Sequence, residues 1–118
     1  QMAPTTLEGQ KTTTSPYGRT DEFTGNPVNM AELISNIPGC YYSERVAVNS
    51  PKTIRQTKAA IKKAFEYQLE GKGLSFVEVV SPCPTGWGVR PTEALDWIDS
   101  TVLNQFPLGV FKAPEEGK

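Results

Sequence analysis

The sequence contains no histidine, and this absence excludes several kinds of catalytic site. Ser-His and Cys-His nucleophile pairs need an imidazole, and imidazole is also the commonest general acid–base group. Every zinc site with a histidine ligand is excluded for the same reason.

Cysteine is also scarce. The two cysteines, Cys40 and Cys83, do not make a disulfide framework, which favours a reduced, cytoplasmic setting. The net charge is -1, from 12 basic and 13 acidic residues, so there is no general attraction to nucleic acid or to an acidic membrane. No apolar run approaches the ~20 residues of a membrane helix, and the N-terminus lacks a signal-peptide pattern. We expect neither nucleic acid nor a membrane as a partner.

The 118 residues have the length of one domain. The chain opens at Gln1 and Met2 inside a loop-like stretch, so we expect it to be a fragment of a longer protein. Residues 1–28 show no helical or strand period and are too long for an ordinary connection. We expect this loop to be disordered or to wrap a cofactor or a partner subunit. Its hydroxyl run, 12–15, either binds phosphates or carboxylates or is simply solvated.

The remaining chain predicts an α/β domain over 29–112, followed by a frayed tail over 113–118. Hydrophobic periods and cap residues predict alternating helices and strands, with helices over 30–36, 51–69 and from 91 to about 106, and strands over 40–48 and 74–80. Two strands joined by a long helix form a right-handed β-α-β unit. The fold class is therefore α/β, a parallel sheet flanked by helices.

The helix over 51–69 has two contrasting faces. Its apolar face contains Ile54, Ile61, Phe65 and Leu69, with Ala60 and Ala64 beside them. The other face is basic and contains Arg55, Lys58, Lys62 and Lys63. This basic face is either solvated or docks an acidic partner protein. No aromatic residue lies between the cations to stack a base, which disfavours nucleic acid.

The stretch 73–88 is where chemistry is expected. Its strand, 74–80, is almost continuously apolar, which is typical of an inner strand covered on both faces. Ligands of open α/β sheets lie beyond the carboxyl ends of the strands, where this chain places Cys83. Cys83, a thiol between two prolines, is either an inert loop residue or a ligand of a metal or cluster. A cluster needs further cysteine ligands, and this sequence offers one, Cys40.

Two other residues of this stretch, Glu78 and Trp87, each allow two interpretations. Glu78 interrupts the apolar strand, and a buried carboxylate must be either paired or functional. Trp87 lies between two glycines and is either a lid on the core or a wall of a ligand cleft.

Three segments resemble one enzyme family. LSFVEVVSPCPTGWG (74–88) looks like part of the thiamine-diphosphate-binding (beta) subunit of 2-oxoacid:ferredoxin oxidoreductases. QMAPTTLEGQKTTTSPYGR (1–19) is similar to the loop after that subunit's diphosphate-binding motif, and FPLGVFK (106–112) to its C-terminal region. The resemblance implies the C-terminal half of that subunit and a partial thiamine-diphosphate-binding fold.

The resemblance also implies cofactors for the full-length subunit: thiamine diphosphate, Mg²⁺ and a [4Fe-4S] cluster. Gln1, Met2 and Thr5 correspond to the loop over thiamine diphosphate, and Cys83 corresponds to an iron–sulfur ligand. The family's Gly-Asp-Gly motif and the other cluster cysteines are not in this sequence, so we expect the fragment alone to bind none of these cofactors and to be inactive.

The implied function is part of an enzyme that oxidatively decarboxylates a 2-oxoacid to acyl-CoA. Its implied partners are the other subunits, with ferredoxin and CoA reaching the complex, and the fragment itself is expected to self-associate. The alternative is a non-catalytic α/β interaction module that docks through its N-terminal loop and its basic helix face.

Overall fold

A parallel β-α-β unit forms the centre of the sheet, as the sequence predicts. Strand β1 (Cys40–Ala47) leads through helix α3 (Pro51–Leu69) to strand β2 (Leu74–Val80), and the two strands pair in parallel. Helix α3 begins with a capping box: Thr53 N donates to Ser50 Oγ at 3.2 Å, and Ser50 N donates to Thr53 Oγ1 at 3.0 Å. Proline at the first helical position removes a donor that would have no partner there.

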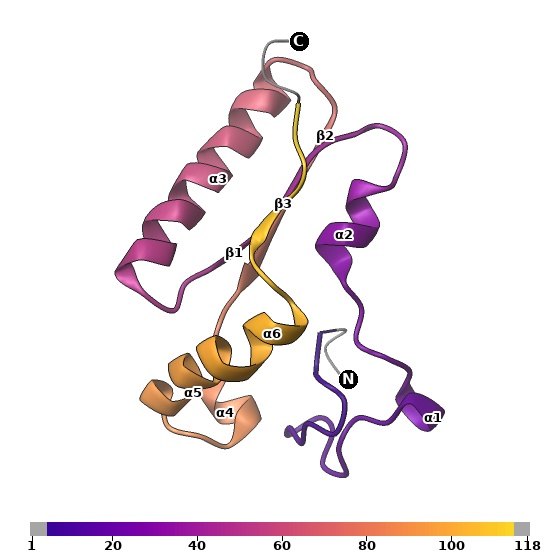
Figure 1. The fold of residues 1–118 in the computed structure, drawn as a ribbon, viewed down its shortest axis with the longest axis vertical. Coiled ribbons are helices and arrows are strands. Elements are labelled where there is room, and N and C mark those ends of the chain that lie inside the picture. The colour runs from indigo at the N-terminus through magenta and orange to yellow at the C-terminus, as the bar shows by residue number, and fades with distance from the viewer. Residues whose placement is uncertain (1–4, 115–118) are drawn as a thin grey trace. The chain divides into compact units, whose positions relative to one another are not determined.

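The computed structural model describes residues 5–114, except for the side chain of Phe23, and its contacts form two compact units (Figure 1). The sheet unit contains Met30–Ser81 and the segment from Pro107 onward. The loop unit contains the segment up to Asn29 together with Pro82–Phe106. Residues 82–106 follow the sheet in sequence but group with the N-terminal loop. No helix within residues 5–114 is long and apolar enough to cross a membrane.

A third strand makes the sheet mixed rather than parallel. Strand β3 (Gly109–Lys112) pairs antiparallel with β1, which gives the order β2-β1-β3. The expected all-parallel sheet is corrected on this point. A four-residue strand is too short to show a hydrophobic period, so the sequence pattern predicts no secondary structure for this segment.

The expectation that β2 is an inner strand is wrong. Within the described sheet β2 is an edge strand, and Leu74 and Val79 remain 45% and 39% exposed. The inner strand is β1, whose residues are all buried or half-buried. An apolar run indicates that a strand is buried, but it does not indicate which neighbouring elements bury it.

Helix α3 packs on the sheet through small residues, not through its large apolar ones. Thr57 and Ala60 are its buried residues, and Thr57 Oγ1 donates to Ala47 O of β1 at 2.6 Å. The large apolar residues of the helix are exposed, with Phe65 at 67% and Leu69 at 87%. Small side chains allow close approach of helix and sheet, so the contact lies on the side of the alanines beside the apolar stripe, where Ala60 is buried and Ala64 half-buried. Figure 1 shows α3 and the short helix α2 (Met30–Ser35) on either side of the strands.

Aromatic packing fills the space between β1 and α3. The rings of Tyr41 and Tyr42 lie edge-on to Tyr67 of α3, with centroids 5.0 and 5.5 Å apart respectively. The Tyr42 hydroxyl donates to the Glu44 carboxylate. Burial of this phenol, and then its hydrogen bond to Glu44 and the charge of Glu44, raise the pKa of Tyr42 above its usual range.

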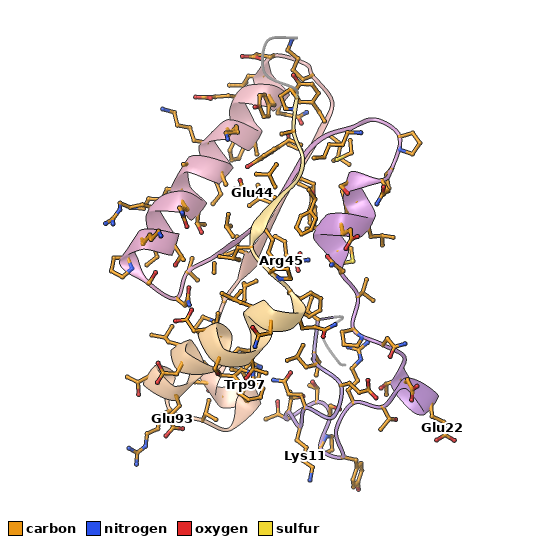
Figure 2. The ribbon with its side chains drawn as sticks, in the orientation of Figure 1. Lys11, Glu22, Glu44, Arg45, Glu93 and Trp97 are labelled. Carbon is orange, nitrogen blue, oxygen red and sulfur yellow. The ribbon has the colours of Figure 1, made fainter. Side chains whose placement is uncertain are left out.

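A buried ion pair holds the sheet unit together (Figure 2 labels Arg45). Arg45 of β1 and Glu78 of β2 are register partners, and Arg45 Nε lies 3.0 Å from Glu78 Oε2. The Arg45 side chain is fully buried. The same Glu78 oxygen accepts from Ala31 N of α2 at 3.2 Å, and Arg45 Nη1 donates to Pro107 O at 3.0 Å, just before β3. Glu78 is therefore a paired carboxylate, which settles the alternative that the sequence left open.

The last predicted helix forms in three pieces within the loop unit. Helix α5 (Pro91–Trp97) continues through a π-helical turn, η1 (Ile98–Val102), into α6 (Leu103–Gln105). The predicted apolar stripe is largely correct, since Ile98, Val102 and Phe106 are buried. The loop unit also contains two short helices, α1 (Asp21–Thr24) and α4 (Pro84–Trp87).

We predict that Glu78→Gln lowers the free energy of unfolding by about 3 kcal/mol, because it leaves the buried Arg45 guanidinium without its counter-charge. Urea unfolding of the chain measures this change. The matched control is Glu66→Gln, which removes the exposed partner of Lys62 and is expected to cost less than about 0.5 kcal/mol. Equal effects of the two substitutions would contradict the importance of the buried pair.

Candidate functional site

The N-terminal loop is organised by a buried arginine. Arg19 is 5% exposed and donates to three backbone carbonyls: Thr6 O at 3.0 Å, Gly25 O at 2.8 Å and Asn26 O at 2.8 Å. The planar guanidinium presents several donors in fixed directions, so one side chain can close a long loop on itself. The expectation that this loop is disordered or wraps a cofactor or a partner subunit stays a prediction.

Backbone hydrogen bonds complete the loop. Gly9 N donates to Arg19 O at 2.7 Å, and Arg19 N donates to Gln10 O at 3.3 Å. Gly18 has a φ of +88°, and a Cβ there would lie 3.1 Å from Gly9 O, so the turn needs glycine for both its conformation and its close approach. In the predicted hydroxyl run, Thr12 and Ser15 exchange backbone hydrogen bonds of 3.1 Å. Its binding of phosphates or carboxylates stays a prediction.

A hydrogen bond ties this loop to the segment that carries the predicted cysteine. Thr13 N donates to Gly86 O at 3.0 Å, within the loop unit. Within the loop unit the structure thus brings together 5–19 and 82–88, which are parts of two of the three segments on which the family resemblance rests.

Cys83 is exposed and precedes the first turn of α4. Its carbonyl accepts from Trp87 N at 2.8 Å, and Pro84 occupies the first helical position. A Cβ on Gly86 would lie only 2.6 Å from Cys83 Sγ, so a side chain at this position would require the exposed thiol to rotate away. The sequence thus fixes an accessible thiol on a short, defined turn.

Of the other residues considered for this site, the structure describes Cys40 and Thr5. Cys40 is buried, and its thiol donates weakly to Tyr42 O at 3.6 Å, as expected of a small core residue. Gln1 and Met2 lie outside the described residues, and Thr5 is half-buried. Within residues 5–114 no group of three or more cysteine or acidic residues could hold a metal ion. An iron–sulfur cluster needs about four cysteine ligands, which this sequence alone does not supply.

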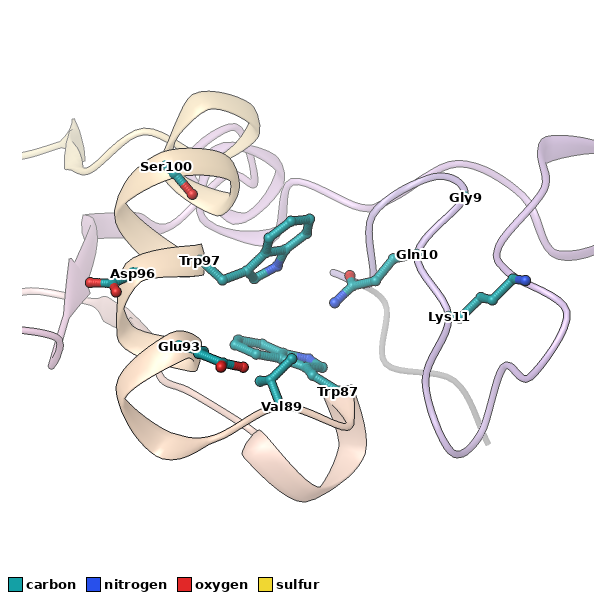
Figure 3. Close-up of a pocket in the computed structure, with 9 residues that line it drawn as sticks. All are labelled: Gly9, Gln10, Lys11, Trp87, Val89, Glu93, Asp96, Trp97 and Ser100. Atoms are coloured by element: carbon teal, nitrogen blue, oxygen red, sulfur yellow. The ribbon is translucent and has the colours of Figure 1, made fainter.

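A cavity of about 540 Å³ lies in the loop unit beside α5 (Figure 3). Its walls come from the loop residues Gly9, Gln10 and Lys11 and from the segment that begins at α4, with Trp87, Val89, Glu93, Asp96, Trp97 and Ser100. Trp87 therefore forms a cleft wall, the second of the two alternatives left by the sequence. Trp97 is not among the residues predicted from the sequence, although Glu93 and Trp97 lie four residues apart on one helix face.

Comparisons with known proteins give relatives over most of the chain. It is 43% identical over 112 residues to ketoisovalerate oxidoreductase subunit VorA of Methanothermobacter marburgensis, covering 95% of this chain and 23% of that subunit. It is 34% identical over 122 residues to 2-oxoglutarate synthase subunit KorB of Archaeoglobus fulgidus, covering 95% and 41% respectively. It is 26% identical over 96 residues to pyruvate synthase subunit PorB of Methanothermobacter marburgensis, covering 81% and 31%.

These homologues are oxidoreductase and synthase subunits whose names specify three different 2-oxoacids. The chain spans between about a quarter and two fifths of the length of these curated relatives. No family model and no solved structure matches the chain. At this level the comparisons confirm the expected relation to subunits of 2-oxoacid oxidoreductases.

We predict that the two thiols differ sharply in accessibility. A thiol reagent should label Cys83 in the native chain, whereas Cys40 should react only when the sheet unit unfolds, because Cys40 is buried. Counting reacted thiols before and after denaturation measures this. Cys83→Ser should leave no fast-reacting thiol, and the matched variant Cys40→Ala should keep it. Fast labelling of Cys83→Ser would show that Cys40 is accessible after all.

Proposed function

We propose that this chain is a segment of the thiamine-diphosphate-binding (beta) subunit of a 2-oxoacid:ferredoxin oxidoreductase. The observation that carries the proposal is 43% identity to VorA over 95% of the chain, together with similarity to KorB and PorB. The exposed Cys83 in its SPCPTGW motif, next to the closed N-terminal loop, supports it. The complete enzyme would oxidatively decarboxylate a 2-oxoacid to acyl-CoA.

In this proposal the chain itself contributes structure and one thiolate. Thiamine diphosphate and iron–sulfur centres supply the carbon and electron chemistry in the complete enzyme, which is consistent with a sequence that has no histidine. Cys83 is held with its thiol accessible, so it can serve as one ligand of a cluster whose other ligands come from outside this chain. Residues 5–114 alone do not fit a complete cofactor site, and we assign them no catalytic step.

Two exposed surfaces of the sheet unit suit contact with the rest of such a complex. One is the apolar stripe of α3, which consists of Ile54, Ile61, Phe65 and Leu69 and is exposed. The other is β2, an edge strand that keeps apolar side chains accessible. Edge strands and contiguous apolar faces favour association with further protein. We propose that other parts of the subunit and its partner subunits cover these surfaces, and that CoA and ferredoxin meet the complete complex.

The alternative function, docking of an acidic partner on the basic face of α3, receives less support. Lys62 lies 3.9 Å from Glu66, and Lys63 lies over the Tyr42 ring at 5.7 Å from its centroid. Half of the four basic residues therefore already have partners within the chain.

We predict that the isolated chain does not bind thiamine diphosphate with Mg²⁺, because the diphosphate-binding motif of the resembling family is not in this sequence. Titration calorimetry measures this, and micromolar binding would contradict it.

In the complete subunit, Cys83→Ser should lower the iron and sulfide content if Cys83 is a cluster ligand. The matched control, Cys40→Ala, should leave it unchanged, and unchanged iron in both variants would refute the ligand role.

We predict that the isolated chain self-associates through the apolar stripe of α3. The variant Phe65→Lys with Leu69→Lys should shift sedimentation toward the monomer, because two charges would then lie in the contact. Tyr17→Lys is the matched control, since Tyr17 is 93% exposed but lies in the loop unit. A monomer at all concentrations, or equal effects of both variants, would contradict this surface.

A further inference from the structure

Both tryptophans of the chain line the cavity of the loop unit. Figure 3 shows the indole of Trp97 projecting from its helix toward the loop that carries Gln10, and the indole of Trp87 lying below it, beside Val89 and Glu93. Trp97 remains 36% exposed although it is a large aromatic residue. The cavity volume of about 540 Å³ lies in the range of small-molecule sites. Two accessible indoles in such a cavity offer flat faces on which an aromatic ring can stack.

A hydrogen-bond donor faces the indoles from the opposite wall. The side-chain oxygen of Gln10 accepts from Leu7 N at 2.9 Å, which fixes the orientation of the amide. The amide nitrogen is then directed toward the tryptophans, as Figure 3 shows. A ligand in the cavity therefore meets an NH₂ group that requires an acceptor.

An acceptor lies on the helix side. Figure 3 shows the carboxylate of Glu93 beside Trp87 and Val89. One of its oxygens, Oε2, accepts from Arg90 N at 3.3 Å, which holds the side chain in the first turn of α5. A carboxylate has acceptor capacity for more than one donor. The charged groups of Lys11 and Asp96, which also line the cavity, point away from the indoles in this view.

We propose that this cavity binds a flat heteroaromatic ring that carries an exocyclic amino group next to a ring nitrogen, as adenine does. The indoles stack on the ring, Gln10 donates to the ring nitrogen, and Glu93 accepts from the amino group. A quaternary ammonium ion would use the indoles and the carboxylate, but it would place a positive charge against the Gln10 donor. The proposal does not rest on the function proposed above, because it uses contacts of the loop unit alone.

The test uses the 118-residue chain with adenosine as the probe and inosine as its matched partner. Inosine replaces the amino group by an oxygen and the ring acceptor by a donor, so both polar contacts are mismatched. The two indole N–H resonances report binding directly. We expect adenosine to shift both resonances with half-saturation below about 1 mM, and inosine to bind at least about tenfold more weakly.

Variants separate stacking from hydrogen bonding. Trp97→Leu should abolish binding of both nucleosides, read from the Trp87 resonance. Glu93→Gln keeps an acceptor for Arg90 N but can also donate to the inosine oxygen, so the preference for adenosine should fall several-fold. Glu22→Gln, which changes an exposed carboxylate of α1 that does not line the cavity, is the matched control and should change nothing. No saturable shift with adenosine, equal binding of the two nucleosides by the native chain, or a response to choline instead would each overturn the proposal.

Discussion

The contact between Arg45 and Glu78 is the constraint on which the sheet unit depends. One guanidinium and one carboxylate, directly opposite each other in the register of β1 and β2, also bind the backbone of Ala31 in α2 and of Pro107 before β3. The Arg45 guanidinium further lies over the ring of Phe111 in β3, 4.9 Å from its centroid. Buried charges must be paired and hydrogen-bonded, so this pair fixes strand register and the attachment of both flanking segments at once.

A buried arginine, Arg19, also organises the loop unit. The Arg19 guanidinium donates hydrogen bonds to backbone carbonyls that water would otherwise bond. The long irregular loop can therefore close on itself. This closure brings Gln10 to the cavity wall opposite the two tryptophans and Thr13 to the carbonyl of Gly86. The chemistry expected near Cys83 and the cavity therefore both depend on how the N-terminal loop is held.

Some expectations failed for a reason that is specific to edge and surface elements. The apolar run of β2 and the apolar stripe of α3 are patterns typical of buried surfaces, yet both keep exposed side chains. A hydrophobic pattern indicates that a surface is buried, but it does not indicate what buries it. This chain spans a fraction of its relatives' length, so other protein can cover its exposed apolar surfaces. The exposed surfaces of β2 and α3 therefore support the proposal that other protein covers them.

The sequence by itself determined the β-α-β unit, the cap at Ser50 and the loop with Cys83, because these depend on residues that are near one another in the chain. It also carried the relation to subunits of 2-oxoacid oxidoreductases through its motifs. Only the tertiary structure decided that β1 is the inner strand, that Glu78 pairs with Arg45, and that Trp97 faces Gln10 across a cavity. These features join residues that are far apart in sequence, and no local period or cap encodes which distant partner a buried charge or an indole will meet.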